Sequence, residues 1–193
     1  MKVDSIKIWN YIQSESEDSI KDRILKILEM CKTSFPDERW EKLYEFDWNT
    51  ITEQFKLFFD KEIEDIISKR ISGLYFGITT VILTNGDSSF ALEAGGTSRC
   101  NFNDKEFNWI FNLEWRGTPL ICDALYQIYK YANIENGLGN DIEWPFGLAI
   151  SIFGIDAMMK QYEQSKRLEN KINIVVGFHD GDMMLLKGIN QET

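Results

Sequence analysis

The chain has 193 residues, of which 44% are hydrophobic and 13% aromatic, enough to bury one substantial core without metals or disulfides. It carries 31 acidic residues against 21 Lys and Arg, a formal net charge of −10. Such a chain lacks the clustered positive charge that binding to nucleic acid or to an anionic membrane surface requires. Its charge suits a basic protein partner instead.

Cysteine and histidine usage limits the chemistry that the chain can offer. Cys31, Cys100 and Cys122 are odd in number, widely spaced and without a CxxC pair, which predicts reduced thiols and a cytoplasmic location. Residues 1–4 lack an apolar signal region, and no apolar run approaches the roughly 20 residues of a membrane span. His179 is the single histidine, so we predict no catalytic acid–base pair, no metal and no cofactor.

The first seventy residues have the apolar spacing of amphipathic helices. Apolar residues recur three and four apart over residues 6–12, 20–31 and 51–71. Pro36 opens a further short helix, and Gly73 ends the last helix of the series. Residues 1–72 are therefore expected to form a helical N-terminal part.

From residue 73 the period changes to that of strands. Asn85-Gly86 is a strong hairpin turn between residues 74–84 and 88–94, and Asp180-Gly181 lies between two further apolar runs, 172–178 and 183–187. The sequence therefore predicts two β-hairpins.

The segment between the hairpins mixes helix and loop signals. Pro119 opens a helix that extends to residue 131, residues 136–140 have the composition of a loop, and a second helix is expected within residues 147–164. We predict an α+β protein in which the helical N-terminal part packs on an antiparallel sheet built from hairpins near 74–94 and 172–187. It is expected to be a single domain, 1–193, with a helical subregion at 1–72 and an α+β core at 73–189.

Several short motifs follow one another along residues 74–188. They are Leu74-Tyr75-Phe76-Gly77, Ala94-Gly95-Gly96, Trp109, Leu125-Tyr126-Gln127-Ile128-Tyr129, a GLGNDIEWP segment at 137–145 and a GFHDGD segment at 177–182. In this order they resemble a family of uncharacterised bacterial cytosolic proteins with a GLGN-x-x-E-[YW]-P loop and a C-terminal GF-x-DGD hairpin. The resemblance implies a bacterial origin and a shared fold, without an activity. His179 stands where the family more often has Asp. More loosely, the chain resembles the immunity proteins of bacterial toxin systems.

The first candidate site is the tip of the second hairpin, His179, Asp180 and Asp182. Carboxylates two residues apart with a Gly between them can share a divalent cation. A turn that joins two apolar strands explains the same residues without any ligand, and the further oxygen ligands of an EF-hand loop are missing. The turn interpretation, a cation site and another kind of binding therefore stand side by side.

The second candidate site is the segment Asn140, Asp141, Glu143 and Trp144. It lies beside glycines and before Pro145, so it is either a loop of special conformation or an exposed contact for a partner or ligand. Catalysis by Asp141 and Glu143 would need a second acid–base partner, which the sequence does not show.

The third candidate site contains Arg99 and Arg116, in a stretch that is rich in loops and carries Trp109 and Trp115. Arg combined with Trp is common at the energetic centres of protein interfaces. The alternative is that these arginines form ion pairs with the chain's own acidic surface. Residues 95–98 could hold an anion at backbone N–H groups, but no Lys follows as in a nucleotide-binding loop.

Together these features predict a non-enzymatic cytoplasmic protein that binds another protein, most concretely an immunity protein that neutralises a basic toxin. The acidic surface would steer the partner and aromatic residues would anchor it. One candidate surface is the acidic face of the helix at 51–71, formed by Glu53, Asp60, Glu62, Glu64 and Asp65. The alternative is a small metal- or metabolite-dependent enzyme in which the acidic loop 140–143 and the hairpin 179–182 converge on one cleft.

Overall fold

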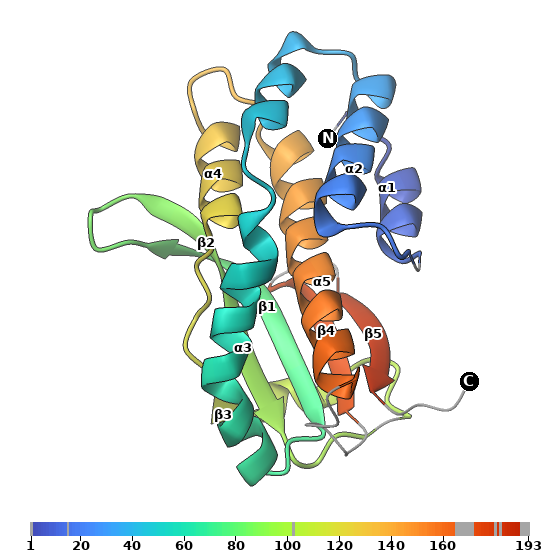
Figure 1. Cartoon of the computed structure of the whole chain (residues 1–193), viewed down its shortest axis with the longest axis vertical. Helices are drawn as coiled ribbons and strands as arrows, with labels where there is room; N and C mark the ends of the chain where they lie inside the picture. The colour runs from blue at the N-terminus through green and yellow to red at the C-terminus, as the bar shows by residue number, and fades with distance from the viewer. Residues whose placement is uncertain are drawn as a thin grey trace.

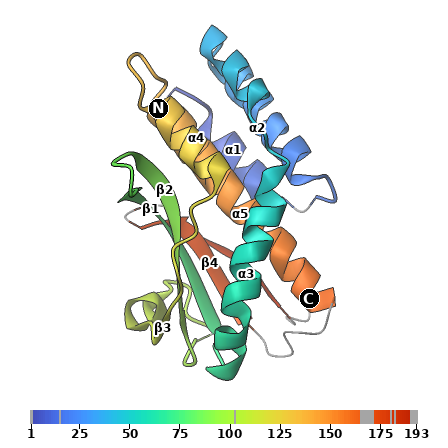
Figure 2. The ribbon, with the colours of Figure 1, turned by 60° about the vertical axis from the view of Figure 1, so that its left-hand side comes forward.

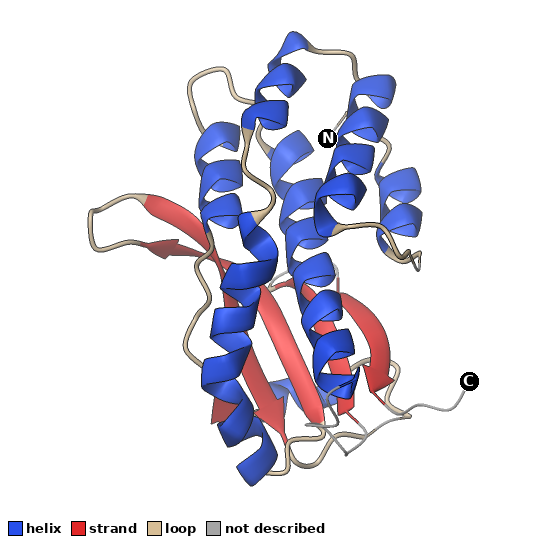
Figure 3. Cartoon of the chain, in the orientation of Figure 1, coloured by secondary structure: helices blue, strands red, loops and turns tan. Residues whose placement is uncertain are grey.

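The computed structural model describes residues 2–14, 16–101, 103–164, 172–179, 181 and 183–189. The elements in chain order are α1 (Ser5–Ile12), α2 (Ile20–Ser34), the 3-10 helix η1 (Glu38–Glu45), α3 (Thr50–Ser68), β1 (Gly73–Ile82), β2 (Ser88–Thr97), the 3-10 helix η2 (Asn108–Asn112), β3 (Trp115–Arg116), α4 (Asp123–Ala132), α5 (Asn140–Gln164), β4 (Ile172–Phe178) and β5 (Met183–Ile189) (Figure 1). The molecule is an α+β protein, as expected from the sequence, with its helices packed against the sheet (Figure 3).

The sheet has five strands in the order β3-β2-β1-β4-β5. Both predicted hairpins are present: β1 pairs with β2 antiparallel around a turn in which Gly86 has φ of 86°, and β4 pairs with β5 antiparallel. The expectation of a wholly antiparallel sheet is wrong at one place, because β1 and β4 are parallel. The chain between β2 and β4 contains α4 and α5, and this helical crossover returns it so that β4 runs in the same direction as β1.

Helix α5 occupies the centre of the molecule. It contacts α1, α2, α3 and α4 as well as β1, β4 and β5, and it lies between the sheet and the helices α1 and α2 (Figures 1 and 2). Helix α3 lies closer to the sheet, with the rings of Phe59 and Phe76 5.6 Å apart. One continuous cluster of buried side chains runs from Val3 to Met184. The helical N-terminal part therefore shares its core with the sheet.

The start of α5 differs from the sequence-based expectation. The sequence predicts a loop at residues 136–140 and a helix within 147–164, whereas the helix begins at Asn140 and includes Pro145 in its second turn. Gly139, with φ of 54°, turns the chain into the helix, and its carbonyl accepts the N–H groups of Ile142 and Glu143. The GLGN motif therefore marks a helix start.

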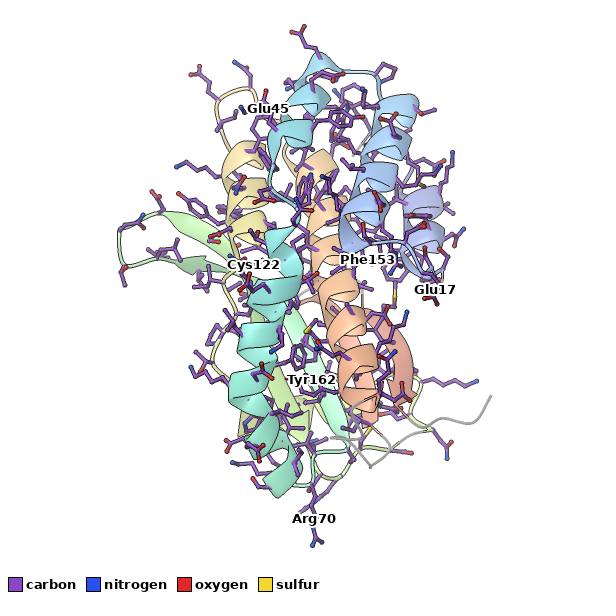
Figure 4. All side chains as sticks on the ribbon, in the orientation of Figure 1. Glu17, Glu45, Arg70, Cys122, Phe153 and Tyr162 are labelled. Atoms are coloured by element: carbon purple, nitrogen blue, oxygen red, sulfur yellow. The ribbon has the colours of Figure 1, made fainter. Side chains whose placement is uncertain are left out.

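By length and composition alone, α5 could cross a membrane. No other helix in the described ranges is both long enough and apolar enough to do so. However, 78% of its most apolar window is buried inside the protein, as in the core helix of a globular protein. Its last turns also carry a polar contact to α3. The Tyr162 hydroxyl donates to the Asp60 carboxylate at 2.6 Å across the gap between the two helices (Figure 4).

The α3–α5 interface allows a direct test of the packing around α5. A Cβ atom at Gly154 would stand 2.5 Å from the ring of the fully buried Phe55, so Gly154→Ala should lower the free energy of unfolding by about 1–3 kcal/mol. Helix propensity alone predicts the opposite sign, a gain of up to about 1 kcal/mol. Chemical denaturation of the purified variant measures the difference.

Gly147 is the matched control in the same helix. Its Cβ would meet the tip of the half-buried Phe178 ring at 3.3 Å and the Phe90 ring at an ordinary contact distance of 3.7 Å, so Gly147→Ala should be neutral or stabilising. Equal effects at the two positions would contradict the close packing of Phe55 on Gly154.

Candidate functional site

The described α-helices that pack on the sheet, α3, α4 and α5, lie on one of its faces. Because side chains alternate along a strand, Tyr75, Glu93 and Val175 point to the opposite face, and in the register of the sheet they lie near one another. Part of this face is covered by residues 98–114, which lie on the side of the sheet away from α3 and α5 (Figure 2). Trp109 packs there with Tyr75 and Val175 in a second, smaller hydrophobic cluster.

Two glycines allow large side chains to lie flat on this face. A Cβ at Gly77 would stand 2.7 Å from the Tyr75 hydroxyl, and one at Gly95 would stand 2.6 Å from Leu113. Tyr75 and Leu113 therefore lie directly over the backbone of β1 and β2. Gly77 also pairs in register with Glu93 on one side and with Gly177 on the other, so the floor between Glu93 and β4 carries no side chain.

An open pocket of about 220 Å³ lies at this place. The residues that line it come from four strands or their ends and from the η2 segment: Tyr75, Glu93, Ala94, Gly95, Ile110, Phe111, Leu113, Arg116 and His179. The Tyr75 and His179 rings are 6.4 Å apart. The structure thus brings together two residues that the sequence had placed in different candidate sites, Arg116 and His179.

The two charged residues of the pocket do not pair with each other. Arg116 is opposite Gly95 in the register, and Glu93 lies two residues along β2 on the same face. Neither side chain forms a hydrogen bond or ion pair within the described part of the chain. Both charges are therefore available to a ligand or partner.

Arg99 has a different environment. Its guanidinium pairs with Glu114 at 3.2 Å, and the same carboxylate accepts hydrogen bonds from the backbone and hydroxyl of Ser98. These hydrogen bonds from Ser98, with the charge of Arg99, lower the pKa of Glu114 below its ordinary value. Of the two arginines, Arg99 thus forms an ion pair with the chain's own surface, whereas Arg116 forms none with the residues that the structure describes.

The acidic segment at the start of α5 lies elsewhere and connects parts of the fold. The buried Asp141 carboxylate accepts the backbone N–H groups of Lys2 and, at 3.1 Å, of Val3. Glu143 accepts from the Asn133 amide at 2.6 Å, and the Trp144 ring lies 6.2 Å from that of Trp9. Asn140 is the first residue of the helix.

None of residues 140–144 lines the pocket that contains His179. Asp180 and Asp182 lie outside the described residues. In the described ranges, no group of three His, Cys, Asp or Glu side chains gathers in a way that could hold a metal ion.

The acidic face of α3 is largely used within the protein. Glu62 is buried and accepts the backbone N–H of Thr118 at 3.2 Å. Asp60 pairs with Lys56, and Asp65 pairs with Lys69 at 3.0 Å, which lowers the pKa of Asp65. This face therefore presents less free negative charge than its sequence indicates.

The residues at the centre of the pocket, Tyr75 and Glu93, were not among the candidate site residues predicted from the sequence. Two features of the sequence could have indicated them: Tyr75 and Gly77 belong to the Leu74-Tyr75-Phe76-Gly77 motif, and Glu93 is the one charged residue of β2. Phe111 is 78% exposed, but nothing in the local sequence indicates that it lies beside β2.

Comparison of the chain with protein-family models, with curated proteins and with solved structures found no match.

Asp141 is expected to be structural. Asp141→Ala leaves two backbone N–H groups without their acceptor and should lower the free energy of unfolding by about 1–3 kcal/mol. Glu143→Ala removes a carboxylate from the same helical turn, where the bond to Asn133 is exposed, and should cost less than about 1 kcal/mol. Urea denaturation of both variants measures the difference, and losses of equal size would argue against this role of Asp141.

The buried thiols should make the protein less stable at alkaline pH. Burial raises the pKa of Cys31 and Cys122 to about 12, with the Asp141 carboxylate contributing at Cys31. Thiols of the unfolded chain titrate near about 8.5, so above this pH the unfolded state binds fewer protons than the folded state. The contribution of the two thiols to the free energy of unfolding should be present in full below about pH 8.5. Above that pH, the free energy of unfolding should fall by about 1.4 kcal/mol per pH unit for each of the two thiols.

Denaturation curves recorded between about pH 8 and pH 10.5 test this dependence. The double variant Cys31→Ala/Cys122→Ala should show a flatter fall than the parent, whereas Cys100→Ala, at a half-buried position, should retain most of the slope. An unchanged slope in the double variant would assign the effect to other groups.

Proposed function

We propose that this chain is a non-enzymatic protein that binds another protein on the face of its sheet opposite α3 and α5. The observation that supports the proposal is that Phe111, 78% exposed, and Arg116, which pairs with no described residue, line one pocket. Aromatic residues and Arg next to a concave surface are the composition of energetic centres in protein interfaces.

The charge of the chain supports a basic partner. With a net charge of −10, the protein attracts a basic surface over distances comparable to the Debye length and raises the association rate. The acidic groups that would steer the partner need not touch it. Phe111 and the pocket would supply the short-range contacts after the encounter.

The most concrete form of the proposal is an immunity protein that binds a basic toxin in the bacterial cytoplasm. The motif order along residues 74–188 resembles bacterial cytosolic proteins, and the chain resembles immunity proteins more loosely. Two of the three free cysteines, Cys31 and Cys122, are buried thiols, which is in keeping with a reducing compartment.

Affinity capture with paired variants tests the proposal. The tagged protein is incubated with lysate of its source organism at about 0.05 M and about 0.3 M salt, and bound proteins are quantified by mass spectrometry. We expect one stoichiometric basic partner whose recovery falls with salt. Its recovery should fall at least about tenfold with Phe111→Ala/Arg116→Ala.

The control Ile6→Ala/Lys26→Ala removes the same charge and a similar exposed apolar group from α1 and α2. It should recover the partner as the parent does. A partner that the Phe111→Ala/Arg116→Ala variant retains in full would place the contact elsewhere, and the lack of any stoichiometric partner would contradict the proposal.

A further inference from the structure

The pocket combines two opposite charges that pair with no other group in the described part of the chain. Glu93 and Arg116 are diagonal neighbours in the register of β2 and β3, and sheet geometry places the Cα atoms of such neighbours about 7–8 Å apart. They do not form an ion pair with each other or with other described residues. A molecule that carries one negative and one positive group can therefore satisfy both.

The rest of the pocket is apolar or aromatic. Ile110, Phe111 and Leu113 line it, together with the rings of Tyr75 and His179, which lie 6.4 Å apart. Tyr75 is only 6% exposed and is held flat by Gly77, so this wall is formed before any ligand binds.

The size of the pocket limits the ligand. The pocket has a volume of about 220 Å³. It is smaller than the roughly 300–1,000 Å³ of pockets that enclose drug-sized molecules. A ligand of this size has about the dimensions of one amino acid.

We propose that this pocket binds a free α-amino acid with an apolar or aromatic side chain. The α-carboxylate accepts hydrogen bonds from the Arg116 guanidinium, and the α-ammonium donates to the Glu93 carboxylate. The side chain of the ligand packs against Leu113 and Phe111. This binding site goes beyond the proposed protein-binding function and does not depend on it, because the isolated chain contains every residue that is invoked.

Isothermal titration calorimetry on the full chain tests the proposal with L-phenylalanine and L-leucine, and with two molecules that carry one charge each. Phenethylamine retains the ammonium group and 3-phenylpropionate the carboxylate. We expect saturable binding of at least one of the two amino acids at concentrations up to about 10 mM. The affinity of each single-charge molecule should be at least about tenfold lower than that of L-phenylalanine.

Charge-removing variants assign the two ends of the ligand. Arg116→Gln should weaken L-phenylalanine at least about tenfold and leave phenethylamine unchanged, and Glu93→Gln should weaken L-phenylalanine without weakening 3-phenylpropionate. Arg99→Gln is the matched control, since Arg99 pairs with Glu114 outside the pocket and should leave binding unchanged. Circular dichroism of each variant checks that it is folded.

Two outcomes would overturn the proposal. One is the lack of saturable binding by either amino acid. The other is binding that Arg116→Gln and Glu93→Gln leave as strong as in the parent. Equal affinity for 3-phenylpropionate and L-phenylalanine would likewise reject a ligand that uses both charges. None of these results depends on a protein partner, so the proposed function stands or falls separately.

Discussion

The structure depends on the burial of one helix, α5, from nearly all sides. Its residues are apolar around most of the circumference, and it contacts four other helices and three strands. A helix of this kind is unstable in water unless its whole surface is covered. The positions of α1 and α2 follow from this requirement, because they cover parts of α5 that the sheet cannot reach. The bond from Asp141 to the backbone of Lys2 and Val3 fastens the first residues of the chain to the same helix.

The α-helices pack around α5 on one side of the sheet. Part of the opposite face is covered by a single, mostly irregular segment. Residues 98–114 cover the part near Tyr75 and Val175. They end beside the part of the sheet where Gly77 leaves the surface without a side chain. The pocket is the space that remains between this segment and His179. The candidate site is therefore a consequence of the way the core is arranged.

The charges of the protein act on two length scales. Much of the acidic face of α3 is used in local contacts, such as the pair of Asp65 with Lys69, so it is a poor candidate for a specific docking surface. The excess of acidic residues over the whole chain still attracts basic molecules from a distance. In the pocket, by contrast, Arg116 and Glu93 are separate charges of opposite sign, suited to recognition at short range.

The sequence by itself determined the α+β class, the helices at 5–12, 20–34 and 50–68 and both hairpins, because apolar period and turn chemistry act between residues close in the chain. It also marked Arg116 and His179 as candidate residues, but in separate sites. Only the tertiary structure decided that β4 runs parallel to β1, that Asp141 binds the chain's first residues, and that His179 and Arg116 line the same pocket. Each of these depends on contacts between residues far apart in sequence. Such contacts are set by the crossover through α4 and α5, which no local pattern encodes.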